Sequence, residues 1–472
     1  MILREWQIHF IFVFWGLGLM GVVLTACGSG DSNGDTGDGD TYGDSDGDTD
    51  ADGDTDGDSD ADGDGDGDSD GDGDTDSDAD GDSASADAVA ELKTWLETNR
   101  GDRSPIESES FAKVGLTAAD ADIVEALLWE DLAAWIESSR KDEVDGKAIS
   151  MDGATLRYEK VYLGDAPAGG RSLIISMHGG GNTTADQNDQ QWQNQIALAQ
   201  NYAPEDALWI APRAPSNEWN MWFTDNIDPM FDRLITNMVV FEGINPNKVY
   251  INGYSAGGDG VYQLGPRMAD RWAAAAMSAG HPNSASPLNL RNIGFAIHVG
   301  GDDTSYDRNL KAAEWGDWLD ELEADDPDGY AHQVEVHPGL PHWMELADQP
   351  SIPFIQHFER SSFPKRVVWR QAERHHTRFY WLTMAKDVPQ TGQIVEATIN
   401  GQQIEITATD VPQITLRLTD ALLDMDADVS VTQNGGILFE GPVSRTIAVI
   451  FQTLSEREDP AAMYRGEITV SL

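Results

Sequence analysis

The chain has 472 residues, a formal net charge of −53 and an isoelectric point near 4.1. So large an excess of negative charge repels a phosphate backbone, which excludes nucleic acid as an expected partner. Hydrophobic residues make up 40% of the chain, enough for a large core, and the single cysteine rules out an internal disulfide.

The first 27 residues have the pattern of an export signal that ends in a lipidation site. Arg4 precedes an apolar run over residues 10–24, which is short for a membrane span but typical of a signal peptide. The segment Leu-Thr-Ala-Cys at 24–27 resembles a bacterial lipobox, and Cys27 is the only cysteine. We therefore expect acylation of Cys27 and a membrane-anchored location in the bacterial cell envelope, facing the periplasm or the exterior. An ordinary signal peptide or a simple membrane anchor is the alternative.

Residues 28–83 are an acidic, low-complexity segment. Positions 31–82 carry 24 Asp and no Lys or Arg. Such a segment cannot form a core and repels itself, so we expect a disordered tether. The motif DTDADG at 48–53 resembles the first half of an EF-hand loop, but the bidentate Glu is missing. Weak calcium association is therefore the most that this segment predicts.

Residues 84–150 are expected to be helical. One helix is predicted from Ala86 to Thr98, and a second from an N-cap at Thr117 to about Ser139. The second has an apolar stripe made by Ile123, Leu127, Leu128, Leu132, Ala133 and Ile136. We interpret the pair as an appendage that packs on the next domain.

Residues 151–364 alternate apolar strands with helical segments, which predicts a mostly parallel sheet covered on both faces. The expected strands are 173–176, 208–211, 249–252, 273–278, 295–299 and 334–336.

The first of these strands ends in a Gly-rich loop, His178-Gly179-Gly180-Gly181. A loop of this type contributes backbone N–H groups to an oxyanion hole when it precedes a nucleophile elbow. Gly179 and Gly180 are the expected donors.

Two tryptophans, Trp219 and Trp222, follow the second strand in a polar loop. Ligands of open α/β folds bind near the carboxyl ends of strands, so both are candidates for contact with a substrate. Packing beneath the loop is an equal alternative. Trp343, further along the chain, is a third candidate.

The segment GYSAG follows the strand at 249–252 and precedes a helical stretch. Strand, sharp turn and helix is the context in which G-x-S-x-G forms a nucleophile elbow. Ser255 is the predicted nucleophile, and the N–H of Ala256 is the predicted second oxyanion donor. Gly253 and Gly257 are required because a side chain there would collide with the neighbouring strand and helix.

An acid and a base follow in the order that such an elbow requires. Asp303 is preferred as the acid over Asp302 and Asp307, because its spacing from Gly300 lets the chain leave the strand first. His342 is preferred as the base over His337, which belongs to a strand end. His342 would accept the serine proton and the carboxylate would orient the imidazole.

Residues 365–472 contain eight short apolar stretches separated by turn signals, with Asn-Gly at 400–401 and at 434–435. They predict a small β-sandwich-like domain, with a helix inserted near 445–459. The adjacent His375 and His376 are a poor chelate, so we expect surface or interdomain residues and no metal site.

The stretch from about 156 to 360 resembles the α/β-hydrolase superfamily. The motifs MHGGGN, VYINGYSAGGDG, HVGGDDT and LPHWM carry the resemblance, which is greatest to secreted esterases related to polyhydroxybutyrate depolymerases and feruloyl and acetylxylan esterases. The resemblance implies a serine hydrolase without metal or cofactor, acting on small-molecule or polysaccharide esters. Many depolymerase-like members have one Gly followed by Cys in the oxyanion loop, whereas this chain has three glycines.

Two other functions remain open at this point. Prolyl-oligopeptidase-like peptidases share the elbow and the order of the triad. A surface-binding lipoprotein without catalysis is the alternative from another class, and the intact Ser, Asp and His argue against it.

Overall fold

The computed structural model of the chain describes residues 77–472, with side chains from residue 82 onward. Cys27, the signal sequence and nearly all of the acidic segment lie outside these residues, as do the predictions made for them. Within residues 77–472, none of the helices is both long and apolar enough to cross a membrane.

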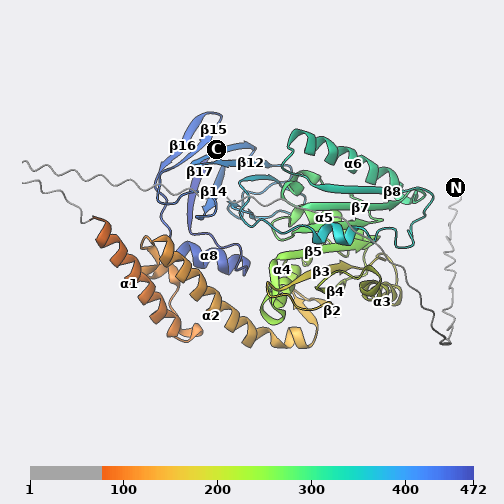
Figure 1. Cartoon of the computed structure of the whole chain (residues 1–472), viewed down its shortest axis with the longest axis horizontal. Coiled ribbons are helices and arrows are strands. Elements are labelled where there is room, and N and C mark those ends of the chain that lie inside the picture. Colours follow the sequence, from red (N-terminus) through yellow and green to blue (C-terminus); the bar gives the residue numbers. More distant parts are fainter. Residues whose placement is uncertain (1–76) are drawn as a thin grey trace, which may run out of the picture. The chain divides into compact units, whose positions relative to one another are not determined.

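Residues 148–337 supply an eight-stranded sheet, called the central sheet below, in the order β1-β2-β4-β3-β5-β6-β7-β8 (Figure 1). The strands from β4 to β8 along this order pair in parallel, whereas β1 and β2 pair antiparallel to their neighbours. This is the α/β-hydrolase fold that the sequence predicts. The strands are β1 (Ala148–Met151), β2 (Ala154–Leu163), β3 (Arg171–Met177), β4 (Ala207–Arg213), β5 (Ile244–Tyr254), β6 (Ala274–Ser278), β7 (Gly294–Gly300) and β8 (His332–His337).

Both faces of this sheet are buried, because side chains of one strand alternate between two apolar cores. In β3, Leu173 and Ile175 belong to a core shared with α4 (Ile227–Glu242), α5 (Ala256–Arg267) and α6 (Arg308–Asp325). Ile174 belongs to the opposite core, which contains residues of α3 (Ala185–Tyr202) and α7 (Ser351–Gln356). The continuous apolar strands of the sequence are explained by this double burial.

The six strands expected from 173 onward are all present, but β1 and β2 were not expected. The prediction of helical structure to residue 150 is wrong for the last residues, because α2 ends at Asp145 and β1 begins at Ala148. Strand β2 lies near the sheet edge with a mixed pattern in which Leu156 and Tyr158 are buried and Arg157 is exposed. A half-buried antiparallel strand lacks the continuous apolar run by which the other six were recognised.

The C-terminal part contains two further sheets. One has the order β16-β15-β13-β12-β9 and the other the order β10-β11-β14-β17. Asn434 and Gly435 both have positive φ and join β15 to β16 in a two-residue hairpin, as their sequence predicts. The strands are β9 (Arg366–Arg370), β10 (Arg378–Phe379), β11 (Leu382–Thr383), β12 (Ile394–Asn400), β13 (Gln403–Thr409), β14 (Gln413–Leu418), β15 (Val429–Gln433), β16 (Gly436–Gly441) and β17 (Gly466–Ser471).

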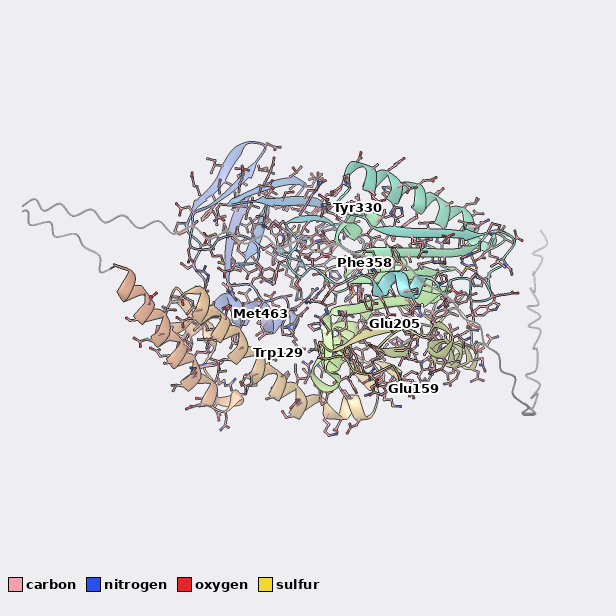
Figure 2. All side chains as sticks on the ribbon, in the orientation of Figure 1. Trp129, Glu159, Glu205, Tyr330, Phe358 and Met463 are labelled. Atoms are coloured by element: carbon pink, nitrogen blue, oxygen red, sulfur yellow. The ribbon has the colours of Figure 1, made fainter. Side chains whose placement is uncertain are left out.

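The N-terminal helices α1 (Ser77–Glu97) and α2 (Ala118–Asp145) share a core with the inserted helix α8 (Ile447–Arg457) (Figure 1). Trp129 and Met463, both labelled in Figure 2, belong to this group. Thr117 caps α2 by accepting the N–H of Asp120, as predicted. The predicted stripe is partly wrong, because Ile123 is 43% exposed. The buried stripe of α2 is formed by Ala121, Val124, Leu128, Leu132, Ile136, Arg140 and Val144.

A buried charge cluster joins the C-terminal part to the central sheet. Asp459, just after α8, accepts hydrogen bonds from Arg271 at 2.6 Å and from Arg360 at 2.7 Å, and all three side chains are almost fully buried. Burial alone raises the pKa of a carboxyl group, but Arg360 and Arg271 outweigh it and hold the pKa of Asp459 well below its usual range. Arg360 has this carboxylate as its ion-pair partner, and Arg271 also lies 3.1 Å from Oδ1 of Asp232.

We predict that Asp459→Ala lowers the free energy of unfolding by about 3–5 kcal/mol, because it leaves the buried guanidinium of Arg360 without its ion-pair partner and removes one of the two carboxylates beside Arg271. Asp428→Ala, at an exposed site in the same part of the chain, is the matched control and is expected to change stability little. Chemical denaturation followed by circular dichroism measures both. Equal midpoints for the two variants would show that the cluster does not stabilise the fold.

Candidate active site

Ser255 lies on the sharp turn between β5 and α5. Its backbone has φ 58° and ψ −118°, a strained conformation for a residue other than glycine. The turn is held because β5 pairs on both sides and because the Ser255 N–H donates to the carbonyl of Ser278 at 2.9 Å. A side chain at Gly253 would overlap Gly257, and one at Gly257 would overlap the backbone of Met177. The two glycines of the motif are therefore required by close backbone contact.

The imidazole of His342 lies between a hydroxyl and a carboxylate. Nε2 of His342 is 3.0 Å from Oγ of Ser255, and Nδ1 is 2.7 Å from Oδ2 of Asp303. Asp303 is buried, and Arg308 lies 3.5 Å from its other oxygen. A carboxylate accepts the Nδ1 proton, so Nε2 is left as the acceptor for the serine hydroxyl. The hydroxyl of Tyr254 also donates to the carbonyl of His342 at 2.6 Å and fixes its loop.

The other acids and bases considered from the sequence lie elsewhere. Asp302 and Asp307 are exposed, and neither forms a hydrogen bond to His342 in the described part of the chain. Nε2 of His337 lies 3.0 Å from Nδ1 of His298, against which the ring is stacked. The geometry thus brings together Ser255, Asp303 and His342.

The Gly-rich loop after β3 lies against the serine. A Cβ placed on Gly179 would be 3.2 Å from Cβ of Ser255. The N–H of Gly181 donates to Oδ1 of Asn188 at 2.9 Å, whereas no hydrogen bond of residues 82–472 uses the N–H of Gly179 or Gly180. Ala256 begins α5, so its N–H has no acceptor within the helix. These three free N–H groups are those predicted to hold an oxyanion.

His178 supports this loop from the protein interior. Its Nδ1 lies 2.6 Å from the carbonyl of Gly179, and Nε2 accepts the N–H of Ala214 at 3.2 Å. One nitrogen donates and the other accepts, which is the pattern of a neutral imidazole. Burial lowers the pKa of His178 to about 4, so the ring stays neutral at physiological pH.

The expectation for Trp222 is wrong. Its side chain is fully buried, packs edge-to-face on His178 and donates Nε1–H to the His178 carbonyl at 2.8 Å. It is a packing residue beneath the Gly-rich loop and has no surface for a substrate. Trp219 and Trp343, by contrast, are 55% and 46% exposed, and Trp343 packs on Tyr254 beside the serine.

Two residues near the serine escaped the sequence analysis. Asn188 binds the oxyanion loop from α3. Asp259, one helical turn after Ser255, accepts the N–H of His281 at 2.7 Å and so holds the loop that follows β6. Burial raises the pKa of Asp259 to about 6. Its place in the first turn of the helix behind the motif was the available signal, whereas nothing local to Asn188 pointed to it.

Two further groups of titratable side chains bear on the expectation of no metal site. Nε2 of His376 lies 2.8 Å from Oδ2 of Asp228, whereas Nε2 of His375 lies 3.0 Å from Oγ1 of Thr391. The two adjacent histidines therefore contact different groups and do not face one common position. Within the described part, one acidic group with a histidine comes together away from Ser255, namely Asp320, Glu323 and His332. It lies at the C-terminal end of α6 and the N-terminal end of β8, whereas Asp303 precedes α6 and His342 follows β8. Oδ1 of Asp320, an exposed residue, lies 3.1 Å from Nε2 of His332.

The sequence matches no protein-family model and no curated protein. Among solved structures it is similar to a thermostable esterase, with 19% identity, a TM-score of 0.35, and coverage of 45% of this chain and 62% of that protein. Similarity to esterase PE8 covers 43% of this chain and 99% of that one, with 16% identity and a TM-score of 0.32. A carboxylesterase from Mesorhizobium loti has 16% identity, a TM-score of 0.30, and coverage of 44% and 96%. Likeness of this degree leaves the reaction of this chain to be argued from its own residues.

Asp259 gives a prediction about stability and pH. In the folded protein it keeps its proton up to about pH 6, whereas the ordinary pKa is 3.8. Between these values the folded state binds the extra proton, so this group makes the protein less stable as the pH rises. Asp259→Asn has no carboxyl group at this position, so it does not lose this stability as the pH rises. Its free energy of unfolding relative to wild type should therefore increase by about 1.4 kcal/mol per pH unit across that interval.

Denaturant titrations at several pH values measure this difference. Asp152→Asn, in an exposed turn, is the matched control and should show a flat difference. A flat difference for Asp259→Asn as well would contradict the raised pKa.

Proposed function

We propose that this protein is a serine hydrolase that cleaves carboxylic esters through an acyl-enzyme. The observation that supports this most directly is the position of His342, within hydrogen-bond distance of both Ser255 and Asp303. A serine hydroxyl is a weak nucleophile unless a base accepts its proton, and this arrangement provides the base and a group that orients it.

The proposed reaction proceeds in two halves. Oγ of Ser255 attacks the ester carbonyl carbon while Nε2 of His342 takes the hydroxyl proton. The carbonyl oxygen gains negative charge, which the N–H groups of Gly179, Gly180 and Ala256 stabilise. The C–O bond to the alcohol breaks as His342 donates the proton to it. Water then attacks the acyl carbon while His342 takes its proton, the bond from the acyl carbon to Oγ breaks as His342 returns the proton to Oγ, and the carboxylic acid leaves.

The exposed rings of Trp219 and Trp343 are the proposed contacts for the substrate, which is either a small ester or an acylated polysaccharide. Aromatic faces offer a large apolar area at little cost in side-chain entropy. No residue of the proposed mechanism requires a metal or an organic cofactor.

The proposed location is the bacterial cell envelope, with Cys27 carrying the lipid. The support is in the sequence alone, namely the lipobox at 24–27 and the single cysteine. The acidic segment that follows would then separate the enzyme from the membrane surface.

Labelling with a fluorophosphonate probe tests the nucleophile. Wild-type protein should be labelled on Ser255 and should hydrolyse p-nitrophenyl esters faster than aminoacyl amides. Ser255→Ala should lose the label and lower kcat by about 10⁴-fold or more. Ser138→Ala, an exposed serine of α2, should keep both. A label on another residue, or faster cleavage of the amide, would overturn the assignment.

The identity of the acid is tested by a pair of neighbouring substitutions. Asp303→Asn removes the charge beside Nδ1 of His342 and favours the wrong tautomer, so kcat should fall by about 10⁴-fold. Asp302→Asn changes an exposed carboxylate and should leave kcat within a few-fold. Steady-state kinetics on one ester distinguish the two, and equal losses would contradict the proposed role of Asp303.

A further inference from the structure

Asn188 is a fully buried amide in the first turn of α3, and both ends of its side chain are engaged. Oδ1 accepts the N–H of Gly181 at 2.9 Å, and Nδ2 donates to Oδ1 of Asn217 at 3.0 Å. The side chain therefore joins the oxyanion loop to the loop after β4, which also carries Trp219.

The direction in which this amide points is fixed by an arginine. Nη2 of Arg213 donates to Oδ1 of Asn217 at 2.5 Å, and a guanidinium group can only donate. The atom of Asn217 that faces Asn188 is therefore an acceptor, so Asn188 must present Nδ2 to it and turn Oδ1 toward Gly181. Arg213 is itself buried and held by Asp189 at 2.7 Å and by the Ala214 carbonyl at 2.8 Å.

The loop fits around this oxygen only because it lacks side chains. Gly180 and Gly181 have φ of 109° and 79°, values that strongly favour glycine. A Cβ on Gly180 would overlap Oδ1 of Asn188. The amide oxygen thus lies directly against the two residues whose backbone makes the turn.

This contact determines which N–H groups of the loop remain available. The hydrogen bond to Asn188 uses the N–H of Gly181 and so fixes the peptide between Gly180 and Gly181. The N–H groups of Gly179 and Gly180 have no acceptor among residues 82–472, and Gly179 itself lies against Ser255. Oxyanion donors are effective when they are held in place before the reaction, since no energy is then spent on orienting them.

We propose that Asn188 is a positioning residue of the oxyanion hole, oriented by Arg213 through Asn217. The inference rests on the proposed function, because it assigns Asn188 to the stabilisation of the charge that develops during ester cleavage. Asn188 touches neither the substrate nor Ser255, and it acts through the backbone of the loop.

Asn188→Ala removes the acceptor for Gly181 and frees the loop. Misplacing a catalytic group by about 1 Å costs on the order of 100-fold, so kcat should fall by about 10- to 100-fold while KM changes by less than about threefold. Affinity for an alkylboronic acid, which forms a tetrahedral adduct with the serine, should fall in parallel with kcat/KM. The matched control is Asn194→Ala, an exposed asparagine of the same helix, which should leave kcat, KM and boronate affinity unchanged.

Asn217→Ala provides a second test at a partly exposed position of the loop after β4. It removes the acceptor that orients the Asn188 amide, so a loss of kcat in the same direction but smaller, about 3- to 10-fold, is expected. Thermal unfolding of each variant and titration of active serine with the fluorophosphonate correct kcat for the folded fraction. This variant decides the question if Asn188→Ala does not fold.

The outcomes separate the inference from the proposed function. If the wild type is labelled and hydrolyses esters but the two variants keep kcat per labelled serine, the role of Asn188 is overturned and the hydrolase assignment stands. If KM rises with kcat unchanged, Asn188 serves substrate binding and the inference is also wrong. If the wild type neither reacts with the probe nor cleaves an ester, the proposed function fails and the inference falls with it.

Discussion

The parallel pairing of β5 between β3 and β6 is the constraint on which the arrangement of the site depends. A parallel sheet brings the carboxyl ends of all its strands to one edge. Ser255 follows β5, the Gly-rich loop follows β3, and the segments with Asp303 and His342 follow β7 and β8. Residues separated by more than 150 positions therefore meet without long excursions of the chain. The same pairing holds Ser255 in its strained turn, since the flanking strand and helix leave no room to relax.

Around this edge, buried neutral groups hold the backbone in place. His178 and Trp222 lie under the Gly-rich loop and use hydrogen bonds to its carbonyl groups, while Asn188 uses one to an N–H. A charged imidazole beneath the loop would cost desolvation energy and would repel the guanidinium of Arg213. The lowered pKa of His178 keeps the ring neutral instead. These uncharged polar supports therefore hold the backbone in place close to Ser255.

Farther from Ser255, buried ion pairs connect separate parts of the fold. Asp459 with Arg271 and Arg360 links the C-terminal part to the central sheet, and Arg140 pairs with Glu458 between α2 and the end of α8. Buried ion pairs contribute little net stability compared with apolar contacts, but removing one partner is costly. Such clusters tolerate few alternative arrangements. They favour one specific packing of the N-terminal helices, α8 and the sheet.

The sequence by itself determined the elements with strong local signals. The buried parallel strands, the elbow at Ser255, the Asn434-Gly435 turn and the cap at Thr117 were each predicted, because each depends on apolar runs or on backbone preferences of a few adjacent residues. Strands β1 and β2 were missed, since half-buried antiparallel strands near the sheet edge have no such run. For the acid and base the sequence indicated a preference, and only the distances from His342 to Ser255 and Asp303 distinguish these residues from Asp302 and His337.

Only the tertiary structure decided which polar and aromatic side chains face the site. Trp219 and Trp222 stand three positions apart in one loop, yet one is exposed and the other is buried under the oxyanion loop. Asn188 has no local feature that marks it, and its role arises from contacts with Gly181 and Asn217. Whether a side chain meets solvent or a distant backbone group depends on packing between elements far apart in the chain. Local sequence carries little information about such long-range contacts, because they form only when the whole sheet and its helices have assembled.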